Sequence, residues 1–198
     1  MNVLVIPEDF RYDQYVLRPI IAAMLDHIGG SPSKVRVLMD PLLGGVSQAL
    51  RWERIEEIIG RYRGMTDLFL LCVDRDGEAG RRTSLDNLES QAKAVLPASK
   101  LMLGENAWQE IEVWLLAGQD LLPGWNWRDI REEVNPKEAY FRPFARDRGL
   151  LDEPGEGRRT LGREAAHQYD RIRTRCPEDV VALEDRIRLW VGGTGETE

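Results

Sequence analysis

Two patterns of apolar and polar residues alternate along the first 118 positions of the chain. Short continuous apolar runs are typical of strands buried on both faces; they are NVLVIPED (2–9), KVRVLMD (34–40), DLFLLCVD (67–74) and SKLMLG (99–104). Each run is followed by a segment with apolar residues at helical spacing, over 12–29, 46–64, 83–96 and 105–118. This alternation predicts an α/β fold, with a mainly parallel, Rossmann-like sheet of four strands flanked by helices.

The pattern changes after residue 118. Residues 119–160 are rich in turn-forming residues and lack strand periodicity, whereas 161–176 and 177–193 predict a closing pair of helices. We therefore expect an α/β core over 1–118, a C-terminal helical extension over 119–192 packed on that core, and a frayed tail over 193–198.

Composition supports a folded chain of one domain with a helical annex. Of the 198 residues 42% are hydrophobic, which is ample for a packed core. No apolar run approaches the ~20 residues of a membrane span, and the chain opens directly on a strand-like run without the features of a signal peptide. We expect a cytoplasmic protein without a membrane partner.

Charge limits the ways in which this chain can bind nucleic acid. The formal net charge of −7 argues against coating nucleic acid by bulk electrostatics. It leaves room for a local basic path. Arg158, Arg159, Arg163 and Arg171 lie on or beside one predicted helix and can track a phosphate backbone. Acidic residues interrupt them, so a solvated helix face is the alternative.

Acidic residues follow two of the predicted strands. Glu8 and Asp9 follow the first, and Asp74 and Asp76 follow the third, with Gly77 next. Because the carboxyl ends of parallel strands share one edge, we expect these carboxylates to converge. Oxygen ligands of this kind suit Mg²⁺ or Mn²⁺. The alternative is a polar turn where the strand leaves the core.

Five short motifs carry a resemblance to a known family. They are VIPED (5–9), LLCVDRDGE (70–78), IEVWLLAG (111–118), NPKE (135–138) and RCPEDVVALEDRI (175–187). An acid after the first strand and Asp-x-Asp after the third resemble the Toprim fold, the catalytic domain shared by topoisomerases, primases, recombination-mediator proteins and overcoming-lysogenization-defect nucleases. The later motifs are similar to those of a small stand-alone bacterial Toprim-like family of unknown function.

The resemblance implies a Mg²⁺-dependent phosphodiester hydrolase that acts on nucleic acid, in bacterial defence or DNA maintenance. Glu8, Asp74 and Asp76 would then be the catalytic and metal-binding residues, with Glu112 as a further candidate. Toprim proteins carry Glu-Gly after the first strand, and this chain has Glu8-Asp9. Asp9 is therefore an alternative to Glu8.

Other functions remain open at this stage. The altered first motif and the acidic charge also fit a non-catalytic binding or regulatory subunit that works with a partner ATPase, and the oligomeric state is open. A haloacid-dehalogenase-type phosphatase carries a similar DxDG sequence, but on its first strand rather than its third. No P-loop sequence occurs in the chain.

Overall fold

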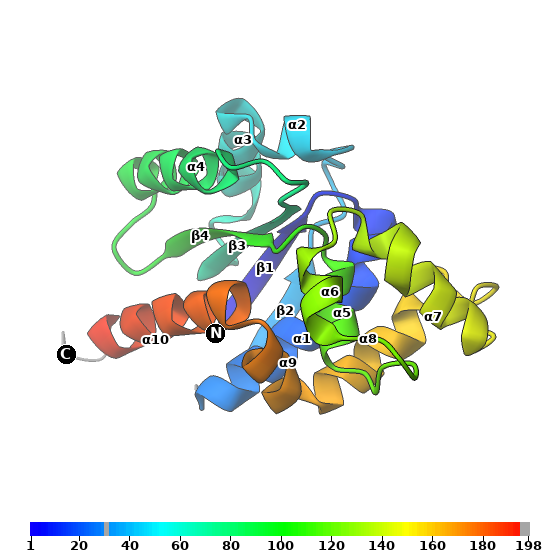
Figure 1. Ribbon diagram of the computed structural model, residues 1–198. Helices are drawn as coiled ribbons and strands as arrows, with labels where there is room; N and C mark the ends of the chain where they lie inside the picture. The colour runs from blue at the N-terminus through cyan, green and yellow to red at the C-terminus, as the bar shows by residue number, and fades with distance from the viewer. Residues whose placement is uncertain (30–31, 195–198) are drawn as a thin grey trace.

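The computed structural model describes residues 1–29 and 32–194 and has an α/β fold. Its four-stranded sheet is parallel throughout, in the order β2-β1-β3-β4, which confirms the expected sheet (Figure 1). The strands are β1 (Asn2–Pro7), β2 (Lys34–Val37), β3 (Leu68–Asp74) and β4 (Leu101–Ala107). After β1 the chain adds β2 on one side of it and β3 on the other, so the order of strands switches between β1 and β3. Ligands of open α/β sheets bind at the carboxyl ends of the strands next to such a switch point.

Helices cover both faces of the sheet (Figure 1). Within the described ranges, no helix combines the length and apolar content needed to cross a membrane. The helices are α1 (Phe10–Ile28), α2 (Val46–Ala49), α3 (Trp52–Tyr62), α4 (Arg81–Val95), α5 (Glu112–Ala117), α6 (Trp127–Glu132), α7 (Arg142–Asp147), α8 (Arg158–His167), α9 (Tyr169–Arg175) and α10 (Ala182–Thr194), with π-helical turns η1 (Lys137–Phe141) and η2 (Pro177–Val181).

Alternate residues of each strand enter two different hydrophobic clusters. Leu4 and Ile6 of β1 pack with α3 and α4, whereas Val3 and Val5 pack on the opposite face with α1. Successive side chains of a strand point to opposite faces, so a central strand needs apolar residues at every position. This is why the strand runs are continuous rather than alternating.

Residues on both sides of position 118 share one of these clusters. Phe141 of η1, Leu161 of α8 and Leu183 of α10 lie in the same cluster as Val5 of β1 and Ile20 of α1. The C-terminal helices therefore complete the layer that α1 begins on that face of the sheet (Figure 1).

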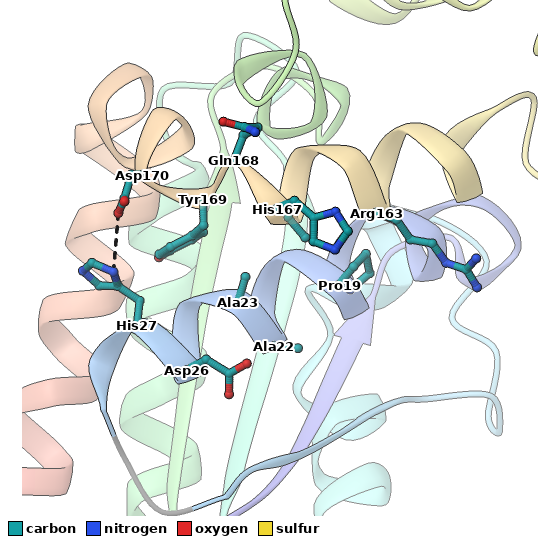
Figure 2. Close-up of a pocket in the computed structure, with 11 residues that line it drawn as sticks. Pro19, Ala22, Ala23, Asp26, His27, Arg163, His167, Gln168, Tyr169 and Asp170 are labelled. Atoms are coloured by element: carbon teal, nitrogen blue, oxygen red, sulfur yellow. Dashed lines mark ion pairs between the residues drawn. The ribbon is translucent and has the colours of Figure 1, made fainter.

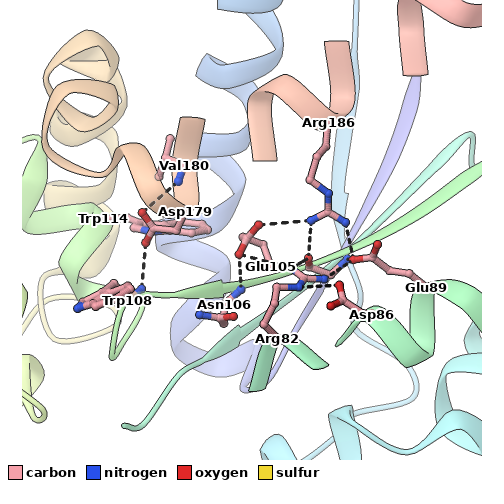
Figure 3. Close-up of polar contacts among 11 residues, drawn as sticks. Arg82, Asp86, Glu89, Glu105, Asn106, Trp108, Trp114, Asp179, Val180 and Arg186 are labelled. Atoms are coloured by element: carbon pink, nitrogen blue, oxygen red, sulfur yellow. Dashed lines mark hydrogen bonds and ion pairs between the residues drawn. The ribbon is translucent and has the colours of Figure 1, made fainter. Parts of the chain in front are cut away.

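Strand β4 lies at an edge of the sheet, where polar side chains join it to α4 and α10 (Figure 3). Arg186 of α10 donates to the Gly104 carbonyl (3.0 Å) and to Glu89 of α4 (2.5 Å), and Arg82 donates to the same two residues. Burial raises the pKa of Glu105, in the middle of this network, to about 7, although the Arg82 charge opposes the shift. These contacts cover an edge that would otherwise be free to pair with another chain.

The structure corrects several of the expected element bounds. The strand expected over 99–104 continues to Ala107, and the helix expected over 105–118 begins only at Glu112. Residues 104–107 pair in register with residues 71–74 of β3, and this sheet pairing overrides the helical spacing of the sequence. The helix expected over 46–64 is interrupted between α2 and α3, where Arg51 is extended.

The C-terminal region is more helical than the sequence pattern predicts. Residues 119–160 contain α6, η1 and α7, and the two expected closing helices are each divided, into α8 and α9 and into η2 and α10. Gly193 and Thr194, expected in a frayed tail, belong to α10. Residues 195–198 lie outside the described residues.

Candidate metal centre

Strand β3 ends in a tight turn that carries the Asp-x-Asp sequence. Asp74 is the last residue of β3, and Asp76 and Gly77 adopt the left-handed conformation, with φ of 52° and 70°. The Glu78 N–H closes the turn by donating to the Arg75 carbonyl at 2.9 Å. Glycine and, less readily, aspartate adopt this left-handed conformation, so the Asp-Gly sequence suits the turn. Both carboxylates therefore stand at the carboxyl edge of the sheet, as the sequence predicts.

Gln109, in the loop after β4, holds this turn. Its carbonyl accepts hydrogen bonds from the N–H groups of Arg75 (2.7 Å) and Asp76 (3.1 Å), and its Oε1 accepts one from the Gly77 N–H (2.9 Å). Gln109 is buried, with its own φ at 71°. The sequence pattern gives no sign of this role, because it predicts a helix through residue 109.

Asp74, Asp76 and Glu110 form the candidate metal cluster. Each offers one carboxylate oxygen, and these oxygens lie within 4.8 Å of one another. Two oxygens on opposite sides of Mg²⁺ are ~4.2 Å apart at ligand distances of ~2.1 Å, so side-chain movements of less than ~1 Å would allow these carboxylates to share a hard cation. The Lys137 N–H donates to Glu110 at 2.7 Å and the Ile111 N–H donates to Asp74 at 2.8 Å, which orients both carboxylates. The sequence pattern does not indicate Glu110, again because it predicts a helix there.

Glu8 lies beside this cluster, at the end of β1. Its Oε2 accepts a hydrogen bond from the Asp74 N–H at 3.3 Å, so the structure brings together the acids from the two strand ends. Asp9 has a different place. It is the N-cap of α1 and accepts hydrogen bonds from the Arg11 N–H (2.9 Å) and Nε (3.4 Å). That capping contact is a structural role, and it leaves Glu8 as the acid from the first strand.

Asp13 is a further carboxylate that the sequence analysis did not single out. It lies in the first turn of α1, where its Oδ2 accepts a hydrogen bond from the Asp9 N–H at 2.9 Å. Burial, reinforced by the charges of Glu112, Glu8 and Asp9, raises the pKa of Asp13 to about 7. The spacing of acids along a helix does not reveal this, because only the fold brings α1 against the end of β3.

Crowding of acids raises the pKa of the other carboxylates as well. Burial and the charges of Glu112, Asp13 and Glu8 raise the pKa of Asp74 well above its usual value. Burial also raises the pKa of Glu8, and it raises that of Glu110 to about 7. With pKa values of about 7, Asp13 and Glu110 keep part of their protons near neutral pH, and a cation bound beside them would favour loss of those protons.

Arg81 is a buried cation at the rim of the cluster. Its Nη2 lies 3.4 Å from both the Asp76 carboxylate and the Arg75 carbonyl, and 9% of the residue is exposed. Among the described residues, its Nε has no hydrogen-bond partner. Because this Nε is itself buried, Arg81 acts on a group outside the protein through its charge rather than through this donor.

Glu112, a candidate ligand by sequence, is instead paired with Arg158. The Arg158 side chain is fully buried, and both its Nε (3.0 Å) and its Nη2 donate to Glu112 Oε1. The guanidinium carbon lies 4.3 Å from the Phe141 ring centroid. The expectation that Arg158 contacts nucleic acid is therefore wrong in this structure, because the side chain has no surface to offer. It joins α8 to α5 beneath the cluster.

The remaining three candidate arginines divide into two groups. Arg171 donates to Asp120 at 2.6 Å. Arg159 and Arg163 are exposed on α8 and line a groove beside α1.

The carboxyl edge therefore collects oxygen ligands, protonatable acids and one buried guanidinium. Asp74, Asp76 and Glu110 suit a divalent cation, and Arg81 suits an anionic group next to it. A scan against protein-family models and searches of curated proteins and of solved structures found no match for this chain.

Proposed function

We propose that this protein is a divalent-cation-dependent phosphodiester hydrolase that acts on nucleic acid, of the Toprim type. The observation that supports the proposal most strongly is the cluster of Asp74, Asp76 and Glu110 at the carboxyl edge, with Glu8 beside it. The four-stranded parallel sheet agrees with the expected fold class.

Each residue has a defined part in this proposal. Asp74, Asp76 and Glu110 would hold Mg²⁺ or Mn²⁺, and such a cation would supply Lewis-acid polarisation of the phosphate, activation of a water and stabilisation of the leaving oxygen. Glu8 adjoins Asp74 and has a raised pKa, which suits it to move a proton at the water or at the leaving oxygen. Arg81, whose Nη2 lies 3.4 Å from the Asp76 carboxylate, supplies positive charge that favours a phosphate next to the cluster.

A specific observation favours a second candidate, a non-catalytic Toprim-like subunit that works with a partner ATPase. The Arg81 guanidinium lies 3.4 Å from the Asp76 carboxylate, where it supplies part of the positive charge that a cation would otherwise provide. A site neutralised from within the chain would keep its shape without turnover.

Cleavage of labelled oligonucleotides tests the proposal. Single strands and duplexes of DNA and RNA are incubated with the protein in Mg²⁺, in Mn²⁺ and in EDTA. We expect cleavage that needs the cation and that falls by at least about a hundredfold in Asp76→Asn. Asp152→Asn, a change at an exposed carboxylate, is the matched control. Cation-independent cleavage would contradict the role of the cation, and no cleavage of any substrate would exclude the hydrolase and favour the non-catalytic subunit.

A further inference from the structure

A second feature lies away from the acidic cluster, in the groove between α1 and α8. This groove has a volume of about 460 Å³ and is lined by Gln14, Tyr15, Arg18, Pro19, Ala22, Arg159 and Arg163. It continues into a neighbouring hollow of about 530 Å³, which shares Pro19, Ala22 and Arg163 with it (Figure 2). From Gln14 to His27 the two hollows follow α1 for about 20 Å, at the helical rise of 1.5 Å per residue.

Three arginines in this groove differ from most others in the protein. Arg18, Arg159 and Arg163 are all exposed, and within residues 1–29 and 32–194 none of them forms an ion pair or a side-chain hydrogen bond. Most arginines of the described chain are paired; Arg148, at the end of α7, contacts Glu164 of α8, and Arg171 of α9 contacts Asp120. An acidic protein thus leaves three guanidinium groups together without a neutralising partner.

Close packing of the two helices brings these arginines together. A Cβ added at Gly162 of α8 would lie 2.2 Å from the Tyr15 carbonyl of α1, so only glycine permits this contact. Arg159 and Arg163 lie three residues before and one residue after Gly162, and Arg18 lies one turn after Tyr15. The contact between the two helices therefore holds three positive charges close together. This arrangement favours the binding of an anionic ligand.

The charge changes along the groove. His27, at the far end, lies 3.5 Å from Asp170, and Asp26 also lines that end (Figure 2). The anion-binding part is therefore confined to the end with the three arginines. That end is also the one nearer the acidic cluster, because Arg18 follows Asp13 by five residues, about 7.5 Å along α1.

We infer that Arg18, Arg159 and Arg163 bind the phosphodiester backbone of a nucleic-acid strand whose neighbouring segment reaches the acidic cluster. Arginine forks match phosphate oxygens, and contacts of this kind position a strand without reading its sequence. The identification of the bound anion as a nucleic acid rests on the proposed function. The position of the groove, and the lack of partners for its three arginines among the described residues, are independent of that proposal.

Binding measured without cleavage tests this inference. Fluorescence anisotropy of a labelled 12-nucleotide single strand and of the matching duplex is recorded in EDTA at several salt concentrations. The variants are Arg18→Gln/Arg159→Gln/Arg163→Gln and, as a matched control, Arg36→Gln/Arg63→Gln/Arg146→Gln, which removes three exposed arginines that line neither hollow. Loss of three contacts should lower the log–log salt slope for the single strand by about two units.

The binding measurements and the cleavage assay test this inference and the proposed function separately. We expect the groove variant to bind at least about tenfold more weakly than the control variant, Arg163→Gln alone to lose about a third of the slope change, and Asp152→Asn, at an exposed carboxylate outside the groove, to bind like the wild type. Equal salt slopes for the two triple variants, or no binding of either oligonucleotide by the wild type, would show that the groove arginines do not bind nucleic acid. Cleavage that fails while groove-dependent binding persists would overturn only the hydrolase.

Discussion

At the scale of single residues, protonation governs the acidic edge of the sheet. Burial and neighbouring charges raise the pKa of Asp13 from 3.8 to about 7. Between these two values the folded protein holds more protons than the unfolded chain, so stability falls as pH rises. A tenfold change in a proton-binding constant corresponds to ~1.4 kcal/mol, so ionisation of Asp13 costs the fold about 4 kcal/mol at pH 8 in the absence of a cation.

Thermal unfolding from pH 5 to pH 8 in EDTA should therefore show a decline in melting temperature. Asp13→Asn, which keeps an acceptor for the Asp9 N–H, should reduce that decline, whereas Asp152→Asn should not. Mg²⁺ should raise the melting temperature more at pH 8 than at pH 6, because its ligands must be deprotonated. A melting temperature that rises steadily over this range in EDTA would show that these acids are not crowded.

Gln109 offers a second test at this scale, because it both orients the Asp-x-Asp turn and bears a strained backbone. Its φ of 71° suits glycine better than alanine, so Gln109→Gly should be more stable than Gln109→Ala by about 1 kcal/mol. Both variants lose the hydrogen bond to Gly77, and both should bind Mg²⁺ more weakly by about 10-fold or more. Equal cation affinity in wild type and both variants would remove Gln109 from the site.

The residues found from the sequence differ in kind from those missed. Asp74, Asp76 and Glu8 lie at the ends of strands. Parallel strands all end at the same edge of the sheet, so the convergence of these acids is predictable from the sequence. Glu110 and Gln109 lie where a local helical pattern conceals the end of β4. Arg158 shows the opposite error, because its polar neighbours in the sequence indicate an exposed side chain. It lies buried against Glu112, and only the packing of α8 reveals this.

At the scale of elements, close contacts between helices fix the geometry of the C-terminal layer. Gly162 of α8 meets the Tyr15 carbonyl, and a Cβ there would require α1 and α8 to separate. Gly162→Ala should destabilise the protein by about 2 kcal/mol or more in denaturant unfolding. Gly60→Ala is the matched control, since nothing lies within 4 Å of its added Cβ in helix α3; it should stabilise the fold by up to about 1 kcal/mol. Similar effects of both changes would contradict the close contact.

The sheet was predictable from the sequence and the helices after residue 118 were less so. Strands buried on both faces are continuous apolar runs, a signal that is independent of their neighbours. Short helices such as α6 and α7 have no more than two turns and depend on burial of single residues, Ile130 and Phe144 among them, in a core made by other elements. Their apolar spacing is too brief to be distinguished from a loop.

At the scale of the whole molecule, Asp179 joins the C-terminal helices to the sheet. This buried carboxylate of η2 accepts hydrogen bonds from Trp114 Nε1 (2.7 Å), the Trp108 N–H (2.9 Å) and Arg131 (2.8 Å) (Figure 3 shows the two tryptophans). The two motifs IEVWLLAG and RCPEDVVALEDRI, far apart in the sequence, meet at this contact.

Asp179→Ala should cost about 3–5 kcal/mol in the free energy of unfolding, because it leaves Arg131 largely buried without its principal partner. Glu178→Ala, at the exposed neighbour that also contacts Arg131, should change stability by no more than about 0.5 kcal/mol. If chemical denaturation gave equal losses for both variants, Asp179 would not be the anchor of this region.

The central claim is that the carboxyl edge of this sheet binds a divalent cation, and isothermal titration calorimetry with Mn²⁺ and Mg²⁺ at pH 7.5 tests it most directly. We expect binding by the wild type with release of protons, because the raised pKa values of Glu110 and Asp13 keep these acids partly protonated near this pH. Asp76→Asn should bind at least about tenfold more weakly, and Asp152→Asn should bind like the wild type. No binding by the wild type, or unchanged binding by Asp76→Asn, would contradict the claim.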